Sequence, residues 1–190
     1  MALIGCSTTE RTPPSAAPAP LATQSPEVPC GTLQLPLAEA PAYSGAGPHL
    51  METGVQSESK VVHSDFGYFS LPDEFLAPPR EDIQVPDPYQ AQLIICRVGL
   101  KLLSEEAVGL CGGGDVPNIP VYPAVHTFTI YETRTARPVT TLTIRGDRLA
   151  EDSCPYYVTY GPGYRVDVAQ GVTKAAFKKR LQSIVFGPVL

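Results

Sequence analysis

Long apolar runs are missing from this chain of 190 residues, and so is an excess of basic residues. No stretch approaches the roughly 18 consecutive apolar residues that a membrane-spanning helix needs, so any membrane attachment would use another device. Lys and Arg number 14 against 19 Asp and Glu, which gives a net charge of -5. Because binding to a polyanion relies on concentrated Lys and Arg, we expect no nucleic acid partner.

The motifs of common enzyme and metal sites are also missing. The chain has no Gly-x-Ser-x-Gly elbow, no His-Glu-x-x-His helix and no Lys-containing phosphate loop. His63 stands beside Ser64 and Asp65, but neighbours on a strand point to opposite faces. No Cys-x-x-Cys pair occurs and the three histidines lie far from any cysteine in sequence, so we expect no metal and no cofactor.

These absences favour a non-catalytic binding or structural module. The alternative is a secreted hydrolase or enzyme accessory domain with an unrecognised active site. For that alternative, the discriminating feature would be a deep pocket that joins His126 or His63 to a carboxylate.

Proline, by contrast, is abundant and unevenly placed. Nine of the 21 prolines fall between residues 7 and 50, in a stretch with no Phe, one Tyr and one basic residue. The stretch has no apolar period of 2 or 3.6, so it lacks the apolar area that would offset the entropy of ordering it. We predict a disordered, partly polyproline linker over residues 7–55, followed by a globular domain over residues 56–190.

The first six residues end in LIGC, Leu3 to Cys6, which resembles the lipobox of bacterial lipoproteins. Leu3 lies three residues before the cysteine and the small Gly5 directly before it, while Ile4 stands where that family usually has Ala or Ser. The resemblance implies that Cys6 carries a diacylglyceryl group and that the amine freed by cleavage is acylated in turn. A secretory signal also needs a basic segment and an apolar segment of about 7 to 15 residues, so we expect the upstream part of the signal to be absent here.

By this resemblance, residues 1–6 are the remnant of a lipoprotein signal. The protein would then be extracytoplasmic and anchored in a bacterial membrane through the lipid on Cys6, in the periplasm or at the cell surface. Its candidate partners are envelope proteins and cell-wall polymer.

The other four cysteines are an even number, compatible with two disulfides in an oxidising compartment. Within the predicted domain we expect one bridge, either Cys96 to Cys111 or Cys111 to Cys154. Cys30 would tie the linker to the domain. The alternative is that all four are buried, reduced thiols.

The predicted domain is mainly β. Residues 60–72 have the Val, Phe and Tyr content of a strand, and the apolar run from Leu93 to Cys96 is typical of a strand buried on both faces. Residues 101–111 fit either a second strand after a turn near Ser104 or a short helix capped by that serine. Residues 126–144 alternate between apolar and Thr positions around a polar turn, which predicts an antiparallel hairpin.

The last segment predicts a helix over about residues 173–186, with Thr173 as N-cap and with Gly187 and Pro188 as the stop. Four apolar residues recur at helical spacing: Phe177, Leu181, Ile184 and Val185. The opposite face is basic, and it is either a contact for anionic lipid or cell-wall polymer or a solvated face: Lys174, Lys178, Lys179 and Arg180. We therefore predict a small antiparallel sheet, or a sandwich, with one C-terminal helix.

Four of the nine tyrosines gather within nine residues: Tyr156, Tyr157, Tyr160 and Tyr164. Tyr offers a rigid apolar face with a polar tip, so this group is a candidate binding patch, although the same residues could serve as core. Residues 92–185 resemble a loosely defined group of small, uncharacterised bacterial envelope domains. The resemblance rests on a cysteine-bearing strand, the Thr-rich hairpin, the pair Cys154 and Pro155, and the closing helix, and it implies a compartment but no activity.

Overall fold

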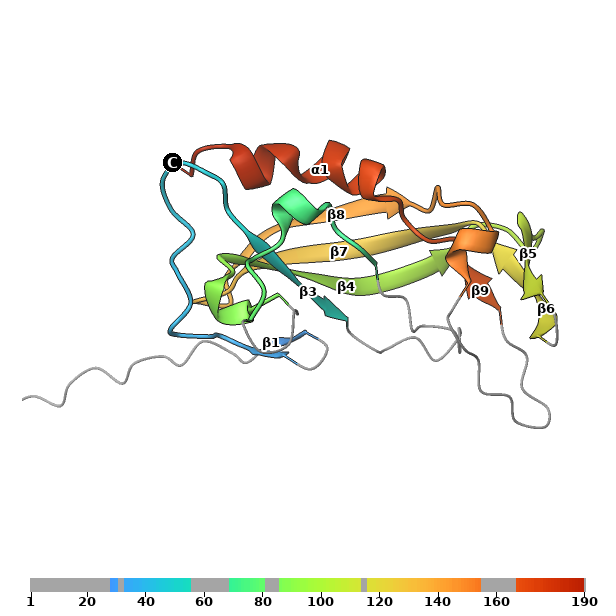
Figure 1. Ribbon diagram of the computed structural model, residues 1–190, viewed down its shortest axis with the longest axis horizontal. Helices are drawn as coiled ribbons and strands as arrows, with labels where there is room; N and C mark the ends of the chain where they lie inside the picture. The colour runs from blue at the N-terminus through green and yellow to red at the C-terminus, as the bar shows by residue number, and fades with distance from the viewer. Residues whose placement is uncertain are drawn as a thin grey trace, which may run out of the picture.

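The computed structural model describes residues 28–30, 33–55, 69–80, 86–113, 116–154 and 167–189. They form three sheets and a C-terminal helix (Figure 1). A two-stranded sheet pairs β1 (Val28–Cys30) with β2 (Leu33–Leu35). The order of the four-stranded sheet is β3 (Met51–Val55), β4 (Leu93–Leu102), β7 (Ala124–Glu132) and β8 (Pro138–Arg145). The order of the three-stranded sheet is β5 (Gly109–Gly113), β6 (Val116–Tyr122) and β9 (Val168–Ala169).

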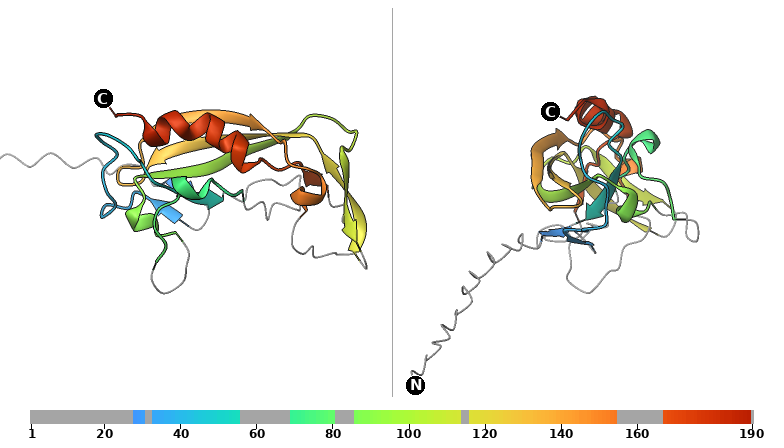
Figure 2. Two further views of the ribbon diagram at one scale, coloured as in Figure 1. Left: turned by 45° about the horizontal axis from the view of Figure 1, so that its top comes forward. Right: turned by 90° about the vertical axis from the view of Figure 1, so that its left-hand side faces the viewer.

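Helix α1 (Lys174–Phe186) lies along one face of the four-stranded sheet, and the β1–β2 pair lies on the opposite side (Figures 1 and 2). Three short 3-10 helices complete the described part: η1 (Asp73–Phe75), η2 (Pro88–Gln90) and η3 (Glu151–Ser153). The predicted class, mainly β with one C-terminal helix, is confirmed. Two of the sheets are mixed rather than purely antiparallel, because β3 runs parallel to β4 and β9 parallel to β6.

Strand β4 is the centre of the fold. Its first five residues, 93–97, are all buried, and the first four of them are the apolar run that predicts a strand buried on both faces. Leu93 and Ile95 belong to the core beneath α1, whereas Ile94 and Cys96 belong to a second core beneath β1 and β2. The chain then turns at Ser104, whose Oγ accepts a hydrogen bond from the Glu106 backbone N–H at 2.9 Å, and enters β5. Of the two alternatives for residues 101–111, the strand with a turn is therefore the observed one.

The predicted hairpin is formed by β7 and β8. Phe128 pairs with Leu142, and the hydroxyls of Thr129 and Thr141 lie 3.0 Å apart on the opposite face of the hairpin. Phe128 is fully buried, while alternate residues of β8 are exposed, so one face is packed and the other wet. This is the arrangement that the alternating sequence indicates.

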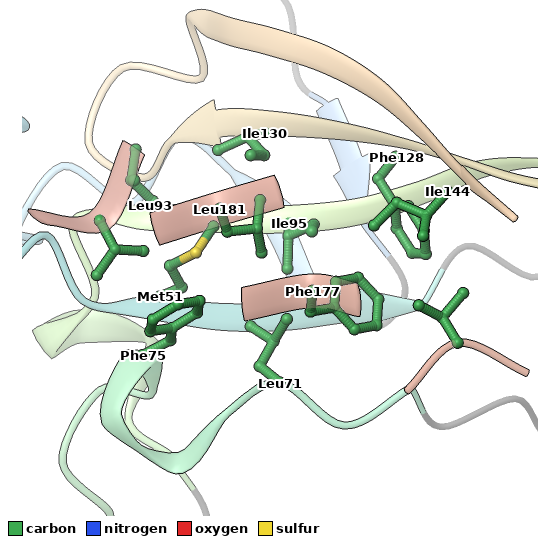
Figure 3. Packing of buried hydrophobic residues seen from close by; sticks show 12 residues of the cluster. Met51, Leu71, Phe75, Leu93, Ile95, Phe128, Ile130, Ile144, Phe177 and Leu181 are labelled. Carbon is green, nitrogen blue, oxygen red and sulfur yellow. The ribbon is translucent and has the colours of Figure 1, made fainter. Parts of the chain in front are cut away.

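The predicted helix is observed almost to the residue. The Thr173 hydroxyl accepts a hydrogen bond from the Ala176 backbone N–H at 3.1 Å, which satisfies one of the free donors at the helix start. Phe177, Leu181 and Val185 are fully buried, and the Phe177 ring lies edge-on to Phe128 with ring centres 5.2 Å apart (Figure 3). The helix therefore closes the larger core.

The basic face of α1 is partly neutralised by η1. The Lys174 ammonium donates to the Asp73 carboxylate, and the Lys178 ammonium donates to Glu74 at 2.8 Å. Two of the four basic residues thus have acidic partners within the chain. These pairs are exposed and add little to stability, but they fix η1 beside the helix.

The linker predicted over residues 7–55 extends too far, because residues 33–55 are part of the folded domain. Leu35 and Met51 are 1% and 0% exposed, and β3 forms an edge of the main sheet. Long-range bonds order this proline-rich segment, including those from the Leu37 N–H to the Thr133 carbonyl and from the His49 N–H to the Val185 carbonyl. Local apolar periodicity does not reveal contacts of this kind.

The strand predicted over residues 60–72 is not observed in its described part. Residues 69–72 form no strand, and residues 60–68 lie outside the described residues.

Two disulfides join the four cysteines of the described residues. Cys30 pairs with Cys96 and Cys111 with Cys154, with Cα atoms 5.6 and 5.3 Å apart. The second of the two predicted domain bridges is therefore the observed one, and Cys30 ties the N-terminal segment to the domain as expected. Gly54 makes room for the first bridge, because a Cβ at this position would collide with the Cys30 sulfur.

We expect the double variant Cys30→Ala/Cys96→Ala to lose about 4 kcal/mol of unfolding free energy in urea denaturation. The bridge closes a sequence separation of 66 residues and therefore restricts the unfolded chain strongly. Peptide mapping of the unreduced protein checks the pairing independently. A Cys96 to Cys111 linkage in that map would contradict the structure.

Phe177→Ala should cost about 3–5 kcal/mol of unfolding free energy, because the ring is fully buried between α1 and the sheet. The matched control is Phe186→Ala on the same helix, where the side chain is 46% exposed and about 1 kcal/mol or less is expected. Thermal or urea unfolding measures both. Equal losses would mean that the helix does not pack on the sheet through the face described here.

Candidate functional site

The site is built on β3, which lies at the edge of the four-stranded sheet. Met51 pairs with Leu93 and Glu52 with Ile94, so side chains alternate between the two faces of the sheet. Met51 packs into the core beneath α1, and Glu52 lies on the opposite face together with Ile94. On its outer side, the Met51 carbonyl accepts a hydrogen bond from the Ala77 N–H at 2.9 Å, and beyond that bond the edge is bordered by a groove.

The groove has a volume of about 500 Å³, within the usual range for ligand sites. Four parts of the chain contribute walls: β2, β3, the segment around η1 and the segment around η2, with Lys174 of α1 at the rim. Its apolar lining consists of Leu33, Phe69, Leu71, Leu76, Pro86 and Pro88. Its polar lining consists of Glu52, Thr53, Ser70, Asp73 and Lys174.

Glu52 is the unusual member of this lining, because it is a carboxyl group with 7% exposure. Its Oε1 accepts two hydrogen bonds, from the Thr53 backbone N–H at 2.8 Å and from the Thr53 hydroxyl at 3.2 Å. Its Oε2 is buried and has no hydrogen-bond partner among the described residues. A buried acceptor without a donor is costly and occurs seldom in folded proteins, so this atom calls for an explanation.

Glu132 provides an internal comparison, since it is as buried as Glu52, at 6% exposure. Both of its carboxylate oxygens are engaged. Oε1 accepts from the Tyr43 N–H at 3.3 Å, and Oε2 accepts from the Thr135 hydroxyl at 2.7 Å and lies 3.4 Å from the Arg137 guanidinium. Glu132 thus stabilises the β7–β8 turn. In Glu52, by contrast, one of the two carboxyl oxygens has no hydrogen-bond partner among the described residues.

Burial raises the pKa of the Glu52 carboxyl above its ordinary value, because the charged form loses its water. The two hydrogen bonds from Thr53 oppose this effect in part, and the negative charge of Asp87 adds to it. A carboxyl in such a site can accept a hydrogen bond when ionised and donate one when protonated. The arrangement is suited to recognising a polar group at the end of an apolar ligand.

The histidines do not join this site within the described residues. His126 is buried on β7, where its Nε2 donates to the Gln170 carbonyl at 2.8 Å, and it does not line the groove. His49 is also buried, with Nε2 donating to the Gly187 carbonyl at 3.1 Å and Nδ1 lying 2.9 Å from the Gln92 side chain. It anchors the end of α1. His63 lies outside the described residues.

Other predicted site residues also lie outside the described residues: Cys6 and the candidate patch of Tyr156, Tyr157, Tyr160 and Tyr164. Those hypotheses remain predictions. The sequence does not predict the groove, because residues 51–55 fall within the predicted linker. One signal was present in the sequence, a single acidic residue inside the short apolar segment Leu50 to Val55.

Comparison with known proteins adds no further assignment. No protein-family model, no curated protein and no solved structure matches this chain. Among the described residues, no group of three or more His, Cys, Asp or Glu side chains is placed to hold a metal ion. No helix in the same part of the chain has the length and apolar character to cross a membrane.

The carboxyl of Glu52 makes stability depend on pH with a defined sign. Since its pKa is raised on folding, its contribution favours the fold below about pH 4.5 and is lost as pH rises through the folded-state pKa. We expect Glu52→Gln to increase the unfolding free energy at pH 7 by about 1 kcal/mol, because the neutral amide avoids a buried charge. Urea denaturation at pH 7 and pH 4 should show that this gain shrinks at the lower pH.

The matched control is Glu132→Gln, at a carboxylate of equal burial. Because both oxygens of Glu132 have partners, this substitution should lower the unfolding free energy at pH 7 by about 1 kcal/mol. Opposite signs for the two variants are the expected result. A loss of stability in Glu52→Gln similar to that in Glu132→Gln would mean that Oε2 has a partner after all.

Proposed function

We propose that this chain is a non-catalytic binding module of the bacterial cell envelope, held at a membrane by lipid on Cys6. The observation that carries the binding role is the groove beside β3, in which a buried carboxyl oxygen lacks a donor among the described residues. The lining provides this buried acceptor and apolar walls, which suit recognition of a ligand on an envelope protein or cell-wall polymer.

The extracytoplasmic part of the proposal is supported by the two disulfides, Cys30 to Cys96 and Cys111 to Cys154. Structural disulfides persist in oxidising compartments and are rare in the cytosol of most bacteria. The lipid anchor is supported by the resemblance of Leu3 to Cys6 to a lipobox. Two or three acyl chains on one residue would hold the protein stably, whereas one chain would hold it marginally.

Because the folded domain begins earlier than predicted, the spacer between Cys6 and the domain is shorter than the predicted linker. Since β1 begins at Val28, residues 7–27 are the part of the predicted linker that precedes the first strand. Twenty-one residues at about 3.1 Å each, the rise of a polyproline II helix, would span about 65 Å. The groove would therefore act within a few nanometres of the membrane.

The test is to express the protein in a bacterium from its full natural reading frame, and to compare it with the Cys6→Ala variant. We expect an intact mass larger by a diacylglyceryl group, and recovery in the membrane fraction, both lost in the variant. Cys111→Ala/Cys154→Ala is the control for a general loss of cysteine, and it should keep the lipid. Unmodified protein in the soluble fraction for both would overturn the anchor.

A further inference from the structure

Three features of the groove beside β3 narrow the chemistry of its ligand, and they are independent of where the protein resides. The first is the free acceptor. Glu52 lines the groove and is 93% buried, and its Oε2 is a buried atom with no donor among the described residues. A ligand that enters here must supply a hydrogen-bond donor, because a buried acceptor without one is costly.

The second feature is the charge around that oxygen. Asp87, between two lining prolines, lies close enough to affect Glu52 electrostatically, and Asp73 stands at the rim. The nearby cation of the lining, Lys174, is half exposed and already donates to Asp73. Among the described residues, the lining thus holds two acidic groups and one basic group, and Asp87 adds negative charge nearby. A cationic donor would satisfy both the Glu52 oxygen and this excess of negative charge.

The third feature is that only one carboxylate oxygen is available. Glu52 Oε1 already accepts from both the backbone N–H and the hydroxyl of Thr53. A guanidinium binds a carboxylate best with two parallel hydrogen bonds, one to each oxygen, and that arrangement is blocked here. An ammonium is a compact donor that needs a single acceptor atom.

We infer that the groove binds a primary ammonium group at the end of an alkyl stem, with the nitrogen on Glu52 Oε2. The stem lies against the apolar walls formed by Phe69, Leu71, Pro86 and Pro88. Such a group is the end of a lysine-like side chain or of a free alkyl diamine. This inference rests on the proposed binding role and specifies its ligand.

The test is an NMR titration of the full chain with its disulfides intact. The reporter is the Thr53 amide, since its N–H donates to the same carboxyl group. Four probes are compared: the blocked lysine Nα-acetyl-lysine methylamide, its norleucine analogue, its arginine analogue and 1,5-diaminopentane. The norleucine analogue keeps the stem and lacks the ammonium, so it isolates the contribution of the charge.

We expect the lysine probe to bind at least tenfold more tightly than the norleucine and arginine probes. Glu52→Gln should weaken lysine binding by tenfold or more. Glu105→Gln changes an exposed carboxylate outside the lining and should alter binding less than twofold. Lys174→Met should tighten binding severalfold, because it removes a competing cation at the rim. If diaminopentane binds and the lysine probe does not, the ligand is a free alkyl amine. If both bind, the groove also accepts lysine-like side chains.

Equal binding of the lysine and norleucine probes would overturn the inference and leave the groove as an apolar binding site. Unchanged lysine binding in Glu52→Gln would also overturn it, as would no shift of Thr53 with any probe in correctly disulfide-bonded protein. These results do not depend on Cys6. Failure of the ammonium assignment is therefore distinguishable from failure of the proposed membrane anchor.

Discussion

Strand β4 is shared by two cores, and the rest of the structure depends on its burial. Beneath α1, Leu93 and Ile95 join a large cluster of aromatic and aliphatic side chains, and on the other face Ile94 and Cys96 join the β1–β2 pair. A strand buried on both faces needs a cover on each side, and both covers come from distant parts of the chain. The C-terminal helix supplies one, and the β1–β2 pair within the proline-rich region supplies the other, joined covalently through Cys30.

The elements that could be predicted from the sequence are those formed by local patterns. The helix is set by its spacing of apolar residues and its Thr173 cap, and the β7–β8 hairpin by strict alternation. Strands β1, β2 and β3 have no such pattern, because each is short and is ordered by tertiary contacts. The proline content of this region is typical of disorder, so it does not indicate that Leu35 and Met51 are core residues.

The groove could not be predicted for a related reason. Its lining comes from residues far apart in sequence, such as Leu33, Glu52 and Lys174, and no motif links them. What is unusual about Glu52 is that its Oε2 has no hydrogen-bond donor among the described residues. This depends on how neighbouring segments of the chain are placed and not on residue type. In the sequence, Glu132 cannot be told apart from Glu52, yet its hydrogen bonds in the folded chain make it a structural residue. The disulfides were accessible to prediction as a short set of alternatives, because cysteines can be counted and paired.

The bond between Cys30 and Cys96 also determines how the domain responds to tension. It closes a covalent loop over a sequence separation of 66 residues, and β3 with Glu52 lies inside that loop. When the N-terminal end is pulled, the load passes from Cys30 directly to β4, and the enclosed residues cannot be extended. The second bridge likewise excludes the residues between Cys111 and Cys154 from extension. Mechanical strain on the N-terminal segment would thus bypass the groove, whose walls at β2, β3 and η1 all belong to the closed loop.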